Sequence, residues 1–136
     1  MAFTATSGLH DAVSRLMSWP VASVETTATL RELAEALAAN EVGAAVVVSG
    51  SRLVGVVSER DVVTHLAAGV DPDRLAVEEV VTLDPVTVAA DRTVLDAARD
   101  MVEAGVRHLP VVNDRDDVVG IVSLRDVAAV LVAAAG

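Results

Sequence analysis

The sequence predicts a mixed α/β protein built from two similar halves. The segment GVVSERD, which begins at Gly55, returns as GIVSLRD from Gly120. Upstream of each segment, apolar residues recur with helical spacing, and two short apolar stretches follow that helix. Each half therefore reads as strand, helix, strand, strand, helix. Because roughly 60 residues with almost no aromatic side chains make a marginal core, we expect the halves to pack sheet to sheet about a pseudo-twofold axis.

The first helix of each half is predicted from a capping box and an apolar face. Thr29 pairs with Glu32 in the first half, and Thr93 pairs with Asp96 in the second. The apolar faces comprise Leu30, Leu33, Ala34, Leu37 and Ala38, then Val94, Ala97, Ala98, Met101 and Val102.

Strands and boundaries follow from the segments around these helices. The stretches PVASV from Pro20 and PVTVA from Pro85 predict the opening strands, and HDAVSRLM before Pro20 predicts a lead-in helix. AAVVV from Ala44 and LPVV from Leu109 predict the strands that follow the helices. We expect a lead-in helix in 1–18, a first repeat in 19–70, a linker with a short helix in 71–82, and a second repeat in 83–136.

Composition excludes several classes of function. The net charge of −10 argues against nucleic-acid binding, which needs a basic surface. The longest apolar run, Val127 to Ala135, is too short for a membrane span, and the start of the chain does not resemble a signal peptide. His10, His65 and His108 show no metal-ligand or triad spacing, so we expect no metal and no enzyme activity. A cytoplasmic protein is the simplest interpretation.

The repeated Ser and Asp allow two interpretations. Ser58 with Asp61, and Ser123 with Asp126, have capping-box spacing, so they could serve only to start the second helix of each half. A helix start also suits a phosphate, and a carboxylate beside it can accept hydrogen bonds from a ribose diol. The buried faces expected on these helices are Val62, Val63, Leu66 and Ala67, then Val127, Ala128, Val130 and Leu131.

The duplicated pattern, with GVRHLPVV from Gly105 and LDPVTV from Leu83, resembles a pair of CBS domains, the module named after cystathionine β-synthase. The chain looks like a stand-alone bacterial CBS-pair protein. This resemblance implies a regulatory module that requires no cofactor and binds AMP, ADP, ATP, S-adenosylmethionine or NAD in clefts between the repeats. An effector protein of unknown identity would respond to it. The alternative is a structural, dimer-forming module with empty clefts.

The resemblance also implies site residues. Asp61 and Asp126 would hold ribose, with Ser58 and Ser123 beside them. The Asp126 cleft would use Thr26 or Thr27 with the backbone of Val42, Gly43 and Ala44, and the Asp61 cleft would use the Ala90 region with Val106, Arg107 and His108.

The two expected clefts are not equivalent. Arg107 and His108 are expected to meet phosphate, whereas Gly43 and Ala44 bring no charge at the matching positions. Asp91 adds negative charge near the Asp61 cleft, so we favour the Asp126 cleft for a phosphorylated ligand. The apolar last helix favours a homodimer.

Overall fold

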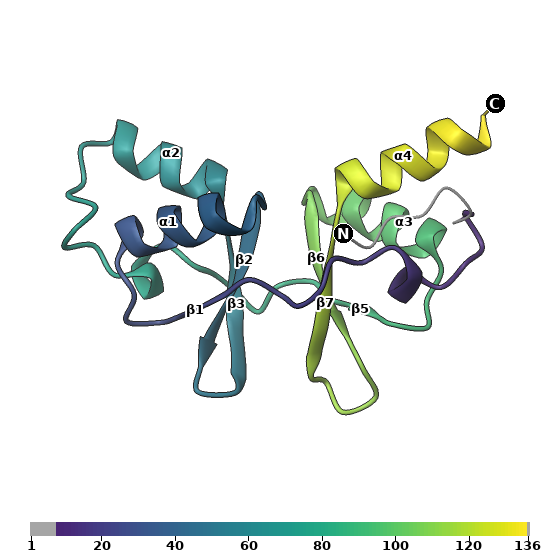
Figure 1. Cartoon of the computed structure of the whole chain (residues 1–136), viewed down its shortest axis with the longest axis horizontal. Helices are drawn as coiled ribbons and strands as arrows, with labels where there is room; N and C mark the ends of the chain where they lie inside the picture. The colour runs from purple at the N-terminus through teal and green to yellow at the C-terminus, as the bar shows by residue number, and fades with distance from the viewer. Residues whose placement is uncertain (1–7, 136) are drawn as a thin grey trace. The chain divides into compact units, whose positions relative to one another are not determined.

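The computed structural model describes residues 8–135 and divides into two compact units. Unit 2 is the continuous stretch 22–85, and unit 1 joins residues 8–21 to residues 86–135. Each unit holds one sheet and two α-helices (Figure 1). The units are described separately below.

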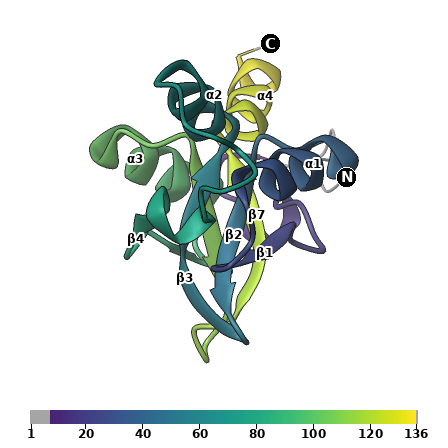
Figure 2. The same cartoon turned by 90° about the vertical axis from the view of Figure 1, so that its left-hand side faces the viewer.

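Unit 2 has a four-stranded sheet in the order β1-β2-β3-β4. Its elements are β1 (Ser23–Glu25), α1 (Leu30–Asn40), β2 (Ala44–Ser49), β3 (Arg52–Ser58), α2 (Glu59–Ala67), the 3-10 turn η2 (Val77–Glu79) and β4 (Thr82–Leu83). Strand β1 runs parallel to β2, while β2, β3 and β4 are antiparallel. Figure 2 turns this unit toward the viewer.

Unit 1 repeats this plan with a three-stranded sheet in the order β5-β6-β7. Its elements are η1 (Val13–Arg15), β5 (Val88–Ala89), α3 (Val94–Ala104), β6 (His108–Val112), β7 (Val118–Ser123) and α4 (Leu124–Ala134). Ser18 adds an antiparallel bridge to Ile121 on the free side of β7. This bridge corresponds to the pairing of Thr82 with Val56 in unit 2.

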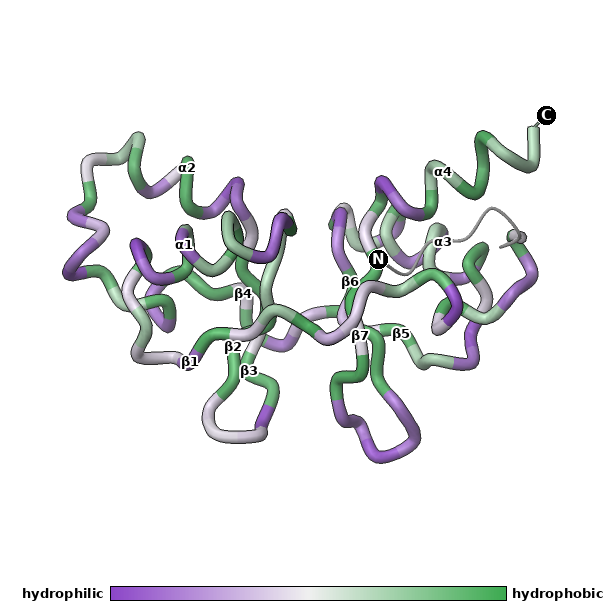
Figure 3. Tube along the Cα trace, viewed as in Figure 1, coloured by the Kyte–Doolittle hydropathy of each residue, from purple (hydrophilic) through white to green (hydrophobic). Residues whose placement is uncertain are grey.

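The predicted helix caps are present in both units. All four α-helices begin with a complete capping box, in which the cap side chain accepts the third backbone N–H and the third side chain accepts the cap N–H. Because these contacts span only three residues, local sequence is enough to fix them. In Figure 3 the strands β2, β3, β6 and β7 are largely apolar, and the turn between β6 and β7 is strongly polar.

Each unit has one apolar core. In unit 1, Val13 and Leu16 from the segment before the first repeat pack with residues of α3, α4 and all three strands. In unit 2, Val77 and Val80 from the segment before the second repeat pack with α1, α2, β2 and β3. Each core is therefore completed by residues that precede the other repeat along the chain.

The repeated segments open with Gly55 and Gly120, and each glycine is covered by another part of the chain: Gly55 by Thr82 and Gly120 by Met17. A Cβ built on Gly55 would stand 2.1 Å from the carbonyl oxygen of Thr82, and one on Gly120 would stand 2.3 Å from Sδ of Met17. A side chain at position 55 would meet the backbone of another part of the chain, whereas one at position 120 would meet the flexible side chain of Met17, so the demand for glycine is stronger at Gly55.

The structure corrects some predictions from sequence. The lead-in helix expected before Pro20 is a single 3-10 turn, η1, and residues 1–7 of that prediction lie outside the described range. On α2 only Val62 is buried; Val63 and Leu66, expected in the core, are 64% and 46% exposed. On α4, Val127 and Val130 are buried as predicted, but Leu131 is exposed.

Candidate ligand site

In unit 1, strand β7 ends at Ser123, which is the N-cap of α4, and Asp126 is the third residue of that helix. The Ser123 Oγ accepts the backbone N–H of Asp126 at 3.1 Å, and the Asp126 Oδ2 accepts the N–H of Ser123 at 3.2 Å. Both residues are half-buried. The capping box occupies one of the two carboxylate oxygens of Asp126, so Oδ1 is not part of the cap.

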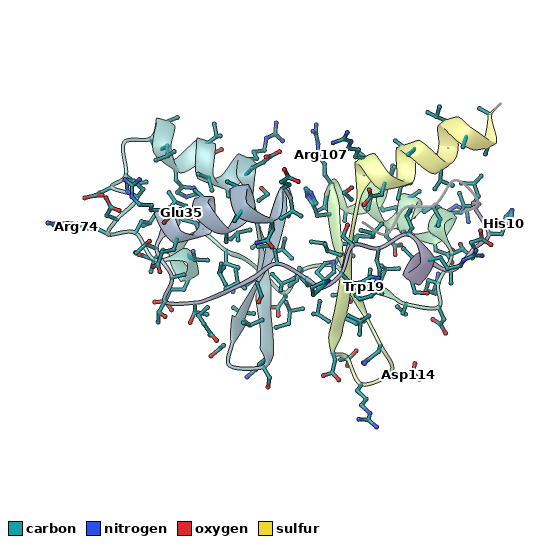
Figure 4. All side chains as sticks on the ribbon, viewed as in Figure 1. His10, Trp19, Glu35, Arg74, Arg107 and Asp114 are labelled. Atoms are coloured by element: carbon teal, nitrogen blue, oxygen red, sulfur yellow. The ribbon has the colours of Figure 1, made fainter. Side chains whose placement is uncertain are left out.

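The start of β6 lies against the same helix end. His108 is paired with Ser123 across the sheet, and the N–H of Leu124 donates to the carbonyl oxygen of Arg107 at 2.7 Å. Gly105, in a left-handed conformation with φ of 68°, ends α3 and turns the chain into β6. Arg107 is exposed and stands beside the first turn of α4 (Figure 4). The Ser123 hydroxyl, the Asp126 carboxylate and the Arg107 guanidinium are thus carried by neighbouring backbone segments.

Unit 2 has the same frame with different side chains. Ser58 and Asp61 form the capping box of α2, with the N–H of Ser58 donating to the Asp61 Oδ2 at 2.8 Å. Ala44 is paired with Ser58, and the N–H of Glu59 donates to the Gly43 carbonyl oxygen at 2.9 Å. Gly43 therefore stands where Arg107 stands in unit 1, as the sequence predicted. The two units share the capping-box geometry, but only unit 1 has a positively charged side chain at this position.

The remaining predicted residues lie at the other end of each central strand. Because β1 is parallel to β2, Thr26 follows the end of β1, and its N–H donates to the carbonyl oxygen of Val48 at 3.1 Å. Val48 is four residues from Ala44, or about 13 Å along the strand. Val42, Gly43 and Ala44 thus lie beside the start of α2, and Thr26 lies at the far end of β2; the assignment of these residues to the Asp126 cleft stays a prediction.

The matching residues of unit 1 behave in the same way. Ala90 donates its N–H to the carbonyl oxygen of Val112 at 2.8 Å, so Ala90 and Asp91 lie at the opposite end of β6 from Val106, Arg107 and His108. The sequence grouped Ala90 with these residues in the Asp61 cleft, and that grouping stays a prediction. The spacing of these residues along β6 follows from the parallel pairing of β5 with β6, which a repeat pattern does not show.

A shallow hollow of about 300 Å³ lies at that far end of unit 1. It is lined by Ala90, Asp91, Val112, Asn113, Asp114, Arg115 and Asp117. The side-chain oxygen of Asn113 accepts the N–H groups of Arg115 and Asp117, so it is occupied by the turn itself. Three carboxylates against one guanidinium make this hollow unsuited to a phosphate.

Other ionic groups serve local structure. Arg92 donates to the Asp96 carboxylate at 3.1 Å, and this contact, with the N–H of Thr93, lowers the pKa of Asp96 to about 2. The Nδ1 of His65 is 2.8 Å from the carbonyl oxygen of Asp61 in its own helix. Within residues 8–135, no cluster of three or more His, Cys, Asp or Glu could hold a metal, and no helix is long and apolar enough to cross a membrane.

These two units define a pair of CBS domains, and the family model for the CBS domain matches residues 13–68 and 77–133. The chain belongs to this family. An uncharacterized 17.7 kDa protein of Acidianus ambivalens is 37% identical over 120 residues, which is 88% of this chain and 72% of that protein. The chain spans 53% of the length of another relative, an uncharacterized protein of Methanopyrus kandleri.

Solved structures extend the similarity to the fold. The CBS domain protein PAE2072 from Pyrobaculum aerophilum, complexed with AMP, is 36% identical, with a TM-score of 0.81 over 92% of this chain and 99% of that one. The CBS domain pair of protein MJ0100, in complex with 5′-methylthioadenosine and S-adenosyl-L-methionine, is 26% identical, with a TM-score of 0.79 over 88% of this chain and 94% of that one.

Proposed function

We propose that this protein is a regulatory module that senses an adenosine-containing ligand, and that the Ser123–Asp126 site of unit 1 is its principal binding site. The observation that carries the proposal is the meeting of Ser123, Asp126 and Arg107 at one helix start in a CBS pair. Similar proteins that were solved with AMP or with S-adenosylmethionine support the ligand class.

Asp126 is suited to the ribose. Its Oδ2 holds the helix cap, and each carboxylate oxygen has two lone pairs, so the carboxylate retains capacity for the hydroxyls of a diol. The cap contact also fixes the carboxylate in place before a ligand arrives, which lowers the entropy cost of binding.

Arg107 is suited to the phosphate. Two of the first three N–H groups of α4 are already used, that of Leu124 by the Arg107 carbonyl oxygen and that of Asp126 by the Ser123 hydroxyl. The helix end alone is therefore a weak anion site, and side chains must supply most of the recognition. The Arg107 guanidinium provides a planar pair of donors for phosphate oxygens.

The test is calorimetry and thermal shift with AMP, ADP, ATP, NAD and S-adenosylmethionine on wild type, Asp126→Ala and Asp96→Ala. Asp96 fills the same third position in the capping box of α3, at the other end of that helix from Arg107, so Asp96→Ala is a control for loss of a cap, and it removes the Arg92 contact as well. Both variants should lose stability, by about 1 kcal/mol for the cap of Asp126. Only Asp126→Ala should lose affinity, by about 1.5–3 kcal/mol.

Arg107→Ala separates the two parts of the ligand. It should weaken AMP more than adenosine, because its role is to recognise charge. If AMP bound Asp126→Ala as tightly as wild type, Ser123 and Asp126 would be helix caps alone, and the proposed site would be abandoned.

A second candidate role, an interaction module that acts without a ligand, is favoured by exposed apolar side chains. On α4, Leu131 is 41% and Val132 is 72% exposed, and Val63 and Leu66 are exposed on α2. We propose that such helix surfaces are covered in a homodimer, and that an effector protein reads the dimer. A monomer in sedimentation at about tens of micromolar would reject the dimer, and binding to no adenine ligand would favour this second role.

A further inference from the structure

The starts of α2 and α4 share one backbone frame but carry different charges. Compared position by position with unit 1, unit 2 has Glu41 for Gly105, Gly43 for Arg107, and Glu59 for Leu124. Arg60 and Arg125 match each other, so they leave the comparison unchanged. Each of the three differences makes unit 2 more negative by one charge. The surroundings of the Ser58–Asp61 pair are therefore three charges more negative than those of the Ser123–Asp126 pair.

The two glutamates of unit 2 belong to the backbone that frames the Ser58–Asp61 pair. Glu59 directly follows Ser58, and its N–H donates to the carbonyl oxygen of Gly43 at 2.9 Å. Glu41 lies two residues before Gly43. Both glutamates are exposed, and within residues 8–135 their carboxylates take part in no ion pair or hydrogen bond. Their charges are thus free to repel an anion through space, without direct contact.

Local stability does not explain Glu41. Its backbone is left-handed, with φ of 54°, and unit 1 has Gly105 at the same helix end with φ of 68°. Glycine adopts this conformation without the steric cost that a side chain brings. The carboxylate is therefore present at a position where the fold alone favours glycine.

The hydroxyl of Ser58 is also committed within its own unit. Its Oγ donates to the Asp61 Oδ2 at 3.1 Å, and the Ser58 N–H donates to the same oxygen at 2.8 Å. Within the described part of unit 1, the Ser123 hydroxyl donates to no carboxylate. A phosphate needs donors, so the start of α2 offers it less than the start of α4 does. The Asp61 Oδ1 lies outside these contacts and can still accept a ribose hydroxyl.

We propose that Glu41 and Glu59 are specificity-determining residues that exclude phosphate from the Ser58–Asp61 pair, so that this pair accepts only an adenosine ligand without phosphate. The inference rests on the proposed function, in which the Ser123–Asp126 site takes the phosphorylated ligand. The chain then binds two chemically different adenosine ligands. A unit charge about 8 Å from a phosphate dianion changes affinity about fivefold at low ionic strength, so two carboxylates weaken AMP by about 25-fold.

Equilibrium dialysis at about 20 mM salt counts the ligands bound per chain. Wild type should bind one AMP, and AMP-saturated protein should bind one adenosine more. Glu41→Gly combined with Glu59→Leu installs the residues of unit 1, and it should strengthen AMP binding to a second site by at least about tenfold while adenosine changes by less than about twofold. Glu78→Gln is the control: it removes a charge beside Thr26, at the far end of β2 from Ala44, and should leave both ligands unchanged. Circular dichroism first shows that each variant is folded.

The outcomes separate this inference from the proposed function. If AMP fills two sites of wild type equally, if AMP-saturated protein takes up no adenosine, or if the double variant binds AMP as wild type does, the specificity role is refuted and the proposed function stands. The role is also refuted if Glu78→Gln strengthens AMP as much as the double variant, because the effect would then be one of net charge. If wild type binds no adenine ligand, both are overturned.

Discussion

Adding one methyl group at Gly55 should destabilise the protein far more than adding it at Gly120. The Cβ of Gly55→Ala would lie 2.1 Å from the Thr82 carbonyl oxygen and 2.5 Å from Cγ2 of Val81. To reach even 3.0 Å from the methyl, that backbone carbonyl must retreat by 3.0 − 2.1 = 0.9 Å. Thr82 belongs to β4, whose only register partners are Val56 and, for Leu83, Gly55 itself.

The magnitude follows from what must move. Overpacking costs about 1–3 kcal/mol, and weakening one β3–β4 hydrogen bond adds about 0.5–1.5 kcal/mol. Replacing glycine gains back about 0.4–1 kcal/mol by restricting the unfolded chain. The net loss expected for Gly55→Ala is about 2 kcal/mol, within a range of about 0.5–4 kcal/mol.

Gly120→Ala meets a flexible side chain instead. Its nearest neighbours are Sδ and Cγ of Met17, at 2.3 and 2.7 Å, and methionine can rotate away. An off-rotamer side chain costs about 0.5–1.5 kcal/mol, and the same unfolded-state gain opposes it, so the net loss should be about 0–1 kcal/mol.

Urea unfolding followed by circular dichroism measures both values, and thermal melts provide a second measure at roughly 3–5 °C per kcal/mol for a chain of this size. Equal losses for the two variants, or a larger loss for Gly120→Ala, would refute the reasoning that the crossing backbone, and not the strand position, demands glycine. A Gly55→Ala protein as stable as wild type would refute the close approach itself.

Two further predictions concern carboxylates. Asp61→Ala should change AMP affinity less than Asp126→Ala in calorimetry, since the start of β2 brings no basic residue to Asp61; a larger effect of Asp61→Ala would reverse the ranking of the sites. The pKa of Asp96 is lowered to about 2 by Arg92, so the stability from this pair is complete above about pH 4 and is lost as pH falls through 2. Acid titration of Asp96→Asn should therefore show a smaller stability loss between about pH 4 and 2 than wild type, and parallel curves would contradict this assignment.

Local contacts explain why much of the fold was predictable. The four capping boxes span three residues each, and the apolar spacing of α1 and α3 correctly places Leu30, Leu33 and Met101 in the cores. The same spacing failed on α2, where Val63 and Leu66 are exposed. Periodicity identifies a helix and its stripe, but the neighbours that cover the stripe are set by distant parts of the chain.

The candidate site was likewise predictable only in part. The repeated sequence segment identified the Ser and Asp of both units, which are Ser58, Asp61, Ser123 and Asp126. Thr26 was grouped with Ala44 in the Asp126 cleft, and that grouping stays a prediction. The parallel pairing of β1 with β2, which places Thr26 at the far end of β2 from Ala44, could not be read from the repeat.

The segment that precedes each repeat packs into the core of the other unit, so the repeat boundaries in the sequence are poor places to truncate the protein. A fragment beginning at Leu83 would keep the whole second repeat and yet lack Val13, Leu16 and the Ser18 bridge, which complete its core and its sheet. Deleting residues 8–18 would therefore remove core contacts of α4, in the repeat that is distant from the deletion along the chain. Grafting residues 8–21 in front of Val86 would join in one short chain the segments that form unit 1, because that unit is built from two separate stretches of the sequence.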